Sequence, residues 1–210
     1  MRSVSHTIYH ALFPQKLQKS DHTKLRILES AIWCYVHYGI EQTTFENIAT
    51  KAGVVRPLVM RYFPNKELLL ELTIKYIRAN LQNLAVAALQ GLTQAEDILE
   101  AYIRSTFRWI EDFPEHAKVW LLFYYYCSIR REFLVVNSEL VSMGQRRISE
   151  VIALGVKQKI FNTNRPSSTA KAIQNFMTGC LLAALTEERV GGALSENQVV
   201  SICFTLAKKG

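Results

Sequence analysis

The sequence lacks the residue patterns that support a metal site, a disulfide framework or a membrane anchor. Its four cysteines, Cys34, Cys127, Cys180 and Cys203, are far apart and form no C-x-x-C pair. This spacing argues against a zinc site or paired disulfides and favours a reducing compartment. No apolar run reaches the ~20 residues that span a bilayer, and the first residues have no apolar core of the signal-peptide type. We therefore expect a cytoplasmic protein that makes no membrane contact.

Catalytic patterns are also missing from the sequence. It has no glycine-rich phosphate loop and no recognisable set of nucleophile, base and acid. His116 follows Pro114, but no histidine or carboxylate accompanies it at the spacing of metal ligands. We interpret His116 as a surface or capping residue. The sequence therefore argues against an enzyme, and we expect no catalytic site, no bound metal and no cofactor.

What the sequence does have is a globular composition with an excess of positive charge. Of its 210 residues, 49% are hydrophobic and 20% are charged, which is typical of a folded chain rather than a disordered one. The net charge of +7 is consistent with a polyanionic partner. The first 66 residues contain nine basic and four acidic side chains, so much of the excess lies in the first third of the chain.

Apolar residues recur at helical spacing along nearly the whole chain, which predicts an all-α protein. The aromatic-rich segment 115–128 could also form a strand, but no partner strand is visible elsewhere, so we interpret it as a helix. Asp21 or Thr23, Ser168 and Ser195 are the expected caps of three of the helices. The expected helices cover residues 22–38 (or 24–38), 44–52, 56–63, 66–89, 94–113, 115–128, 131–159 (as one or two helices), 169–188 and 196–208.

The stretch 39–66 has the pattern of two short helices joined by a tight turn. Thr43 and Glu46 have capping-box spacing, so we expect them to begin the first of these helices. Gly53 suits the left-handed residue that ends a helix without a Cβ clash. Pro57 falls in the first turn of the second helix, where the missing N–H would have no partner in any case.

Helix, turn and helix is the arrangement whose second helix enters the DNA major groove. The outward face of that helix is expected to carry Arg56, Leu58, Met60 and Arg61, and Asn65 caps the helix that follows. A guanidinium group can bind guanine bidentately or can contact a phosphate. The alternative is an ordinary helical hairpin with a solvated basic face.

The residues of this stretch resemble the DNA-binding region of the TetR family of transcriptional regulators. The family pattern runs G-x-x-x-T-T-x-x-x-I-A-x-x-A-G-V, then S-x-G-x-L-Y-x-Y-F, then x-x-K-E-x-L. This sequence departs from it at Val55, which stands in place of serine, at Pro57 in place of glycine, and at Val59 and Met60 in place of Leu-Tyr. The matching residues are Gly39, Thr43, Thr44, Ile48, Ala49, Ala52, Gly53, Val54, Tyr62, Phe63, Lys66, Glu67 and Leu69.

The resemblance implies a homodimeric regulator that binds a palindromic operator in double-stranded DNA, with repression as the expected sign. It also implies release by a small hydrophobic or aromatic ligand. By resemblance Lys66 meets a backbone phosphate, and the alternative is a solvated lysine. The expected DNA-contact residues are Thr43, Thr44, Arg56, Pro57, Leu58, Met60, Arg61, Tyr62 and Lys66.

Three regions follow from this reading. Residues 1–21 form a flexible or loosely docked arm whose basic residues are an option for further DNA contacts. Residues 22–66 form the helix-turn-helix domain. Residues 67–210 form a helical regulatory and dimerisation domain.

The regulatory region has a cluster of aromatic residues with a few polar groups, which is the usual lining of a small-molecule pocket. Ordinary core packing is the alternative for each of them. The candidate pocket residues are Phe107, Trp109, His116, Trp120, Phe123, Tyr124 and Cys127.

The last two helices either close the core of one chain or, by resemblance, pair with those of a second chain. The residues expected at such a dimer interface are Phe176, Gly179, Cys180, Ala183, Ala184, Val199, Ile202 and Leu206. A competing functional class is a ligand- or redox-sensing helical scaffold that acts through protein contacts, with Cys127 and Cys34 as its reactive groups.

Overall fold

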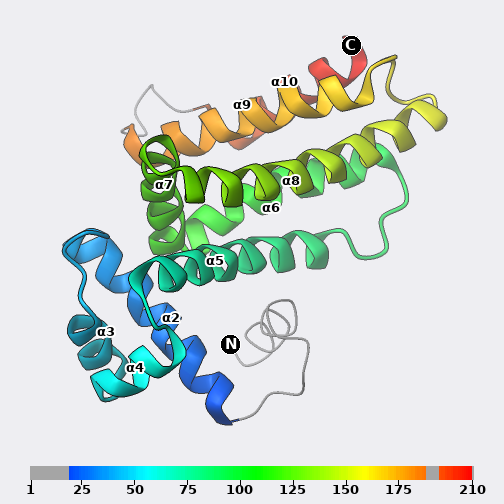
Figure 1. Cartoon of the computed structure of the whole chain (residues 1–210). Helices are drawn as coiled ribbons and strands as arrows, with labels where there is room; N and C mark the ends of the chain where they lie inside the picture. The colour runs from blue at the N-terminus through cyan, green and yellow to red at the C-terminus, as the bar shows by residue number, and fades with distance from the viewer. Residues whose placement is uncertain (1–18, 188–193, 210) are drawn as a thin grey trace. The chain divides into compact units, whose positions relative to one another are not determined.

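The structure is a computed structural model that describes residues 19–187 and 194–209, and this part of the chain is helical throughout (Figure 1). The prediction of an all-α protein is confirmed. Most of the expected amino-terminal arm lies outside the described residues. The helices are α2 (Lys19–Tyr38), α3 (Phe45–Ala52), α4 (Arg56–Tyr62), α5 (Lys66–Ala88), α6 (Ala95–Asp112), α7 (Pro114–Ile129), α8 (Arg131–Lys157), α9 (Pro166–Thr186) and α10 (Glu196–Lys209).

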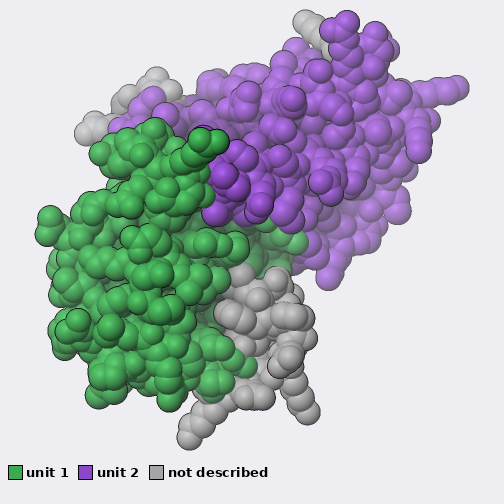
Figure 2. Space-filling view, viewed as in Figure 1, with its two compact units in different colours: residues 1–83, 113–133 green, residues 84–112, 134–210 purple. Residues whose placement is uncertain are grey.

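The chain divides into two compact units, drawn in green and purple in Figure 2. Unit 1 comprises residues 1–83 and 113–133, and unit 2 comprises residues 84–112 and 134–210. The expected boundary at residue 67 divides the chain into consecutive segments, whereas each compact unit combines two segments that are separate in the sequence. The helix α7 belongs to unit 1 because it packs against α2.

Unit 1 is built around α2, which contacts both α3 and α7, while α3 contacts α4. The inner face of α2 is fully buried at Ile27, Leu28 and Ile32. Phe123 of α7 and Ile74 of α5 are fully buried in the same unit. Removing such apolar side chains from water is the main stabilising contribution to this fold.

The start of α3 differs from the expected capping box. Thr44, not Thr43, is the N-cap: its hydroxyl accepts the Asn47 N–H at 3.1 Å, and the Asn47 side-chain oxygen accepts the Thr44 N–H at 2.9 Å. Thr43 is buried and donates its hydroxyl to the carbonyl of Gly39 at 2.7 Å. The predicted pairing of Thr43 with Glu46 is therefore wrong, because asparagine at the third helical position gives the same reciprocal bonds one residue later.

Two other expected helix starts are also wrong. The helix α2 begins at Lys19, ahead of both Asp21 and Thr23. The helix α9 begins at Pro166 rather than at Ser168, because proline at a first helical position loses no hydrogen bond. By contrast, the expected caps of α5 and α10 are confirmed. Asn65 accepts the Leu68 N–H at 2.7 Å, and Ser195 accepts the Gln198 N–H at 3.4 Å.

Unit 2 has its own core, in which α6, α9 and α10 contact one another. Ion pairs support this packing at its edge. The Arg104 guanidinium on α6 lies 2.6 Å from Glu196 at the start of α10, and Lys208 at the other end of α10 lies 3.3 Å from Glu96. The buried core residues are Ala95, Leu99, Ile103, Ile148, Ile152, Phe161, Ala170, Ile173, Met177, Val199, Val200, Cys203 and Ala207.

Gly155 on α8 gives a test of how tightly this core is packed. A methyl group at this position would lie 2.1 Å from Cδ2 of Phe161, whose ring is 3% exposed. We expect Gly155→Ala to lower the free energy of unfolding by about 1–3 kcal/mol, measured by urea denaturation, because the ring must move within a filled core.

The matched control is Gly144→Ala on the same helix, whose methyl group would meet only the flexible end of the Gln174 side chain. It should change stability by less than about 1 kcal/mol. Equal stabilities of the two variants would show that the core around Phe161 is loosely packed.

Candidate nucleic-acid interface

The turn between α3 and α4 sets the direction of the second helix. Gly53 has φ 62°, ψ 42°, and its N–H reaches the carbonyl of Thr50 at 3.2 Å. The Val54 N–H bonds to the carbonyl of Ala49 at 3.0 Å. A left-handed residue that satisfies the last carbonyls of a helix favours glycine, because it has no Cβ to clash. The predicted end of α3 at Gly53 is confirmed.

Packing rather than capping holds α4 in place. Its N-cap residue, Val55, makes no side-chain cap bond, although Pro57 occupies the first turn as expected. Val59 is fully buried and Phe63 is 1% exposed, so both anchor the helix in unit 1. The outer face of α4 is left to solvent.

The structure places the expected contact residues of α4 on this outer face. Met60 is 41% exposed, and the arginines beside it are exposed. Leu58 and Tyr62 are half-buried at its edges. The exposed residues of this face are Arg56, Pro57, Met60 and Arg61.

Several cationic side chains of α2, α3 and α4 lie close to aromatic rings. The Arg61 guanidinium donates to the Tyr62 hydroxyl at 3.3 Å, and Lys24 of α2 lies 5.5 Å from the centre of the same ring. Lys51 of α3 lies 3.8 Å from the ring centre of Trp33. Neither Lys24 nor Lys51 was among the expected contacts, because sequence spacing does not show which ring a distant lysine covers. They add positive charge beside α4 and on α3.

The expected contacts outside α4 have different environments. Lys66 begins α5, is exposed, and donates its ammonium to the backbone carbonyl of Glu41 at 3.2 Å. Thr44 is exposed at the N-cap of α3. Thr43 is 2% exposed, so its side chain faces inward instead of facing solvent.

His116 lies inside unit 1, which corrects the expectation of a surface or capping histidine. It is 5% exposed, its Nε2 lies 3.6 Å from the Glu29 carboxylate on α2, and its ring stacks edge-on against Phe113. Position 116 faces inward because α7 packs against α2.

Glu29, whose side chain is 46% exposed, is the acidic partner of the buried His116, and the Tyr76 hydroxyl donates to its carboxylate. Burial raises the pKa of Glu29, but the hydrogen bond and charge of His116 and the hydrogen bond from Tyr76 offset it, so the pKa lies below its ordinary value. These contacts tie α2 to α5 and α7.

The seven candidate pocket residues are divided between the units. Phe107 and Trp109 belong to unit 2, and the other five belong to unit 1. Within unit 1 the ring of Trp120 lies 6.4 Å from Phe123 and 6.3 Å from Tyr124, as in a packed aromatic cluster. A common pocket formed by all seven stays a prediction.

The expected dimer residues differ in burial, and those that are half-buried are Phe176, Cys180, Ala183, Ile202 and Leu206. Val199 is fully buried in the core of unit 2, so its side chain faces inward and is not available to a partner. Gly179 and Ala184 on α9 are exposed. Leu182, on the same helix, is 49% exposed and was not among the expected residues.

The two cysteines of the redox alternative are buried. Burial raises the pKa of Cys127 to about 11, and its thiol donates to the carbonyl of Phe133 at 3.5 Å. Burial also raises the pKa of Cys34, although Lys51 opposes this. Because the thiolate is the reactive form, neither environment favours redox chemistry.

Within residues 19–187 and 194–209, no group of three or more histidine, cysteine, aspartate or glutamate side chains is placed to hold a metal ion. None of the helices there combines the length and the apolar character needed to cross a membrane.

A short helix packed by its inner face, with arginines on its outer face, defines a protein of the helix-turn-helix class. Residues 27–73 match the family model of bacterial regulatory proteins of the tetR family. Residues 27–73, which include α3 and α4, are therefore similar to this family, and the match covers less than half of the chain.

Known relatives agree with this assignment over part of the chain. The chain is 34% identical over 98 residues to the HTH-type transcriptional regulator BetI of Rhizobium meliloti (strain 1021), a match that covers 47% of this chain and 48% of BetI. The matched region is thus about half the length of this relative.

Solved structures share the fold over nearly the whole chain. A transcriptional regulator from Pseudomonas aeruginosa PAO1 superposes with a TM-score of 0.77 at 16% identity, over 90% of each chain. A transcriptional regulator from Saccharomonospora viridis, in complex with choline, gives a TM-score of 0.75 at 18% identity, over 87% of this chain and 93% of that one.

Arg61 and Lys66 should affect DNA binding in different ways. If Arg61 reads a base, Arg61→Ala should weaken binding to the preferred sequence by about 1–3 kcal/mol and relax specificity at one position. If it meets a phosphate, the variant's affinity should depend less steeply on salt concentration instead. Fluorescence anisotropy with matched and scrambled duplexes separates these results. If neither the specific affinity nor its salt dependence changes, Arg61 does not contact DNA.

Lys66→Ala is the comparison for Arg61→Ala. It should weaken binding to all duplexes about equally, since a phosphate contact carries no sequence information. Loss of specificity at one operator position would contradict that role.

The buried thiols give a separate prediction. In native protein near neutral pH, Cys127 should react with iodoacetamide on the order of a hundredfold more slowly than free cysteine, because little thiolate is present. Mass spectrometry of timed samples measures this rate, with urea-unfolded protein as the control. Labelling of native protein at the rate of free cysteine would support the redox-sensing scaffold.

Proposed function

We propose that this protein is a transcriptional regulator that binds a palindromic operator as a homodimer and is released from it by a small molecule, acting as a repressor. The observation that carries the proposal is the outer face of α4, where Arg56 and Arg61 are exposed while Val59 and Phe63 fix the helix from within.

Charge supports a DNA partner for this face. The exposed arginines of α4 are joined by Lys66 at the start of α5 and by Lys51 on α3. Neutralising phosphates with such side chains releases counterions from DNA, which supplies affinity regardless of sequence. Base contacts from Arg56 or Arg61 would then supply specificity.

A dimer follows from how little DNA one helix can read. Two recognition helices related by a twofold axis lie one DNA turn apart, about 34–36 Å, and double the number of base pairs read. The apolar residues that α9 leaves exposed, including Leu182, support an interface on this helix. Small residues such as Ala183 and Ala184 allow close helix approach there.

A small-molecule ligand is supported by analogy with the choline complex of the Saccharomonospora viridis regulator. In the proposed mechanism the ligand prefers a conformation in which the two reading helices are wrongly spaced for DNA. Binding then lowers DNA affinity by the difference in ligand affinity between the two conformations.

The test of the proposed function is selection of bound duplexes from a random DNA pool near physiological salt, repeated at higher salt. A palindrome with half-sites about one turn apart is the expected result. Weak binding without sequence preference at both salt concentrations would contradict the proposal and leave the helix pair a structural element.

The dimer interface has its own test. Ala183→Phe should raise the monomer fraction measured by sedimentation velocity, because a bulky ring would keep the two copies of α9 apart. Ala87→Phe, at an exposed position of α5, is the matched control and should leave the profile unchanged. Identical profiles for the wild type and both variants would argue against an interface on α9.

A further inference from the structure

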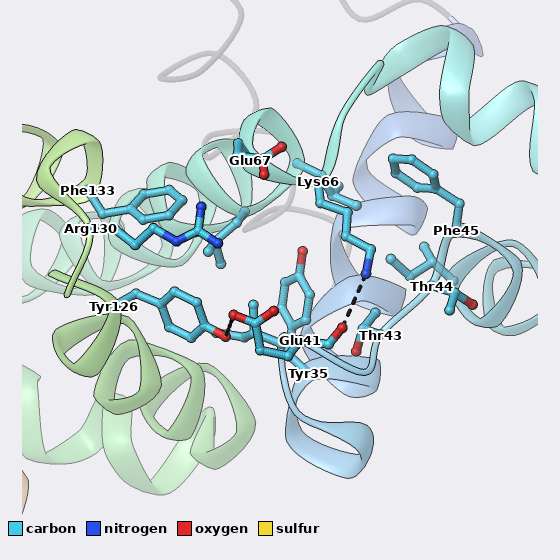
Figure 3. A pocket seen from close by; sticks show the side chains of 14 residues that line it. Tyr35, Glu41, Thr43, Thr44, Phe45, Lys66, Glu67, Tyr126, Arg130 and Phe133 are labelled. Atoms are coloured by element: carbon cyan, nitrogen blue, oxygen red, sulfur yellow. Dashed lines mark hydrogen bonds between the residues drawn. The ribbon is translucent and has the colours of Figure 1, made fainter.

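Unit 1 has a cavity beside the helix-turn-helix, formed by α2, α3, α5, α7, the start of α8 and the chain that connects them (Figure 3). Its empty space measures about 470 Å³ when the open mouth is included. None of the seven candidate pocket residues lines it. The lining residues are Tyr35, Ile40, Glu41, Thr43, Thr44, Phe45, Ile48, Lys66, Glu67, Leu69, Leu70, Tyr126, Arg130 and Phe133.

Most of this lining is apolar. Ile48, Leu69 and Leu70 of the lining are buried, and the rings of Phe45 and Phe133 also line the cavity. An enclosed apolar surface with a few polar groups is the usual character of a small-molecule site. The space inside the cavity is about 50 Å³, so the body of a bound ligand would extend into the open mouth.

Hydrogen-bond donors approach this space from three elements. Figure 3 shows the Arg130 guanidinium and the Lys66 ammonium on opposite sides of the Tyr35 hydroxyl. Lys66 uses one N–H on the carbonyl of Glu41, which leaves two further N–H groups on the ammonium. Burial raises the pKa of Tyr35 well above its ordinary value, and its hydroxyl has a hydrogen bond with Thr73, which does not line the cavity.

The acidic groups of the cavity are partly engaged. Glu41 accepts a hydrogen bond from the Tyr126 hydroxyl at 2.8 Å. Burial and that hydrogen bond raise the pKa of Tyr126 to about 12, so the donor persists at neutral pH. Glu67 is exposed at the edge of the lining, and Glu132 lies 3.6 Å from Arg130 outside it.

We propose that this cavity is a binding site for a small organic acid, whose carboxylate meets Arg130 and Lys66 while its apolar body lies against Phe45, Leu70 and Phe133. The fork of N–H groups on Arg130 matches the two oxygens of a carboxylate. The Glu41 carboxylate accepts a hydrogen bond from Tyr126, and this bond connects two residues of the lining.

The site also includes residues of the proposed DNA interface. Lys66 and Thr44 line the cavity and are expected DNA contacts. A carboxylate bound to Lys66 neutralises the charge that would otherwise meet a DNA phosphate, so acid and DNA compete for one ammonium. This second step rests on the proposed function, whereas binding of the acid does not.

The experiment uses three probes of the same shape and different charge: benzoate, benzamide and benzamidine. Their dissociation constants for the full chain are measured by ligand-observed NMR titration without DNA. We expect benzoate to bind at least about tenfold more tightly than benzamide, as a charge-assisted hydrogen bond predicts. Benzamidine as the tightest ligand, or no binding of any probe at millimolar concentration, would overturn the proposal.

The location is tested by Arg130→Gln, which changes an exposed side chain and should leave folding intact. It should weaken benzoate binding at least about tenfold and leave benzamide unchanged. Arg131→Gln is the matched control, because Arg131 is exposed and does not line the cavity. Equal benzoate affinity in the wild type and Arg130→Gln would place benzoate elsewhere and overturn the assignment.

The competition step is then measured with DNA. Benzoate should weaken DNA binding by the wild type and by Arg131→Gln, but not by Arg130→Gln. If the protein binds no specific DNA, the proposed function fails, while the NMR titration still shows whether the cavity binds benzoate. If benzoate binds and DNA affinity does not change, the competition step is wrong.

Discussion

A helix of seven residues does not hold itself together in water, and α4 is such a helix. Its N-cap, Val55, makes no capping bond, so its stability comes from burying Val59 and Phe63 in unit 1. The left-handed Gly53 points it away from α3. Everything proposed about DNA depends on this arrangement, because only a helix fixed from within can present Arg56 and Arg61 in a constant geometry.

The support for α4 extends through the rest of unit 1. The core face of α2 carries α3, and the contacts of Glu29 with Tyr76 and His116 tie α2 to α5 and α7. The bond from Tyr126 to Glu41 joins α7 to the segment just before α3. A shift of α7 would therefore reach both the reading helices and the cavity that contains Lys66. This would give the proposed ligand-driven change a physical route to the proposed DNA-binding face.

Local rules predicted the elements well and their long-range contacts poorly. Apolar periodicity gave the all-α fold, and Gly53, Pro57 and Asn65 marked real boundaries. The capping box was misplaced by one residue, because Asn47 can replace Glu46 in the reciprocal bond. The burial of His116 and the pairing of Glu41 with Tyr126 depend on how α7 returns to α2, and no short-range pattern in the sequence reports that.

The most direct test of the account is the dependence of affinity on half-site spacing. With a selected operator, five base pairs inserted between the half-sites would rotate one half-site by about half a turn, since B-DNA repeats every 10–10.5 base pairs. The account predicts that this insertion lowers the affinity to that of a single half-site. An insertion of about ten base pairs restores the rotational alignment but moves the half-sites one turn further apart, so affinity then recovers only if the dimer can extend. Affinity that is unchanged by the five-base-pair insertion would show that the two reading helices do not act as one rigid pair, and would contradict the account.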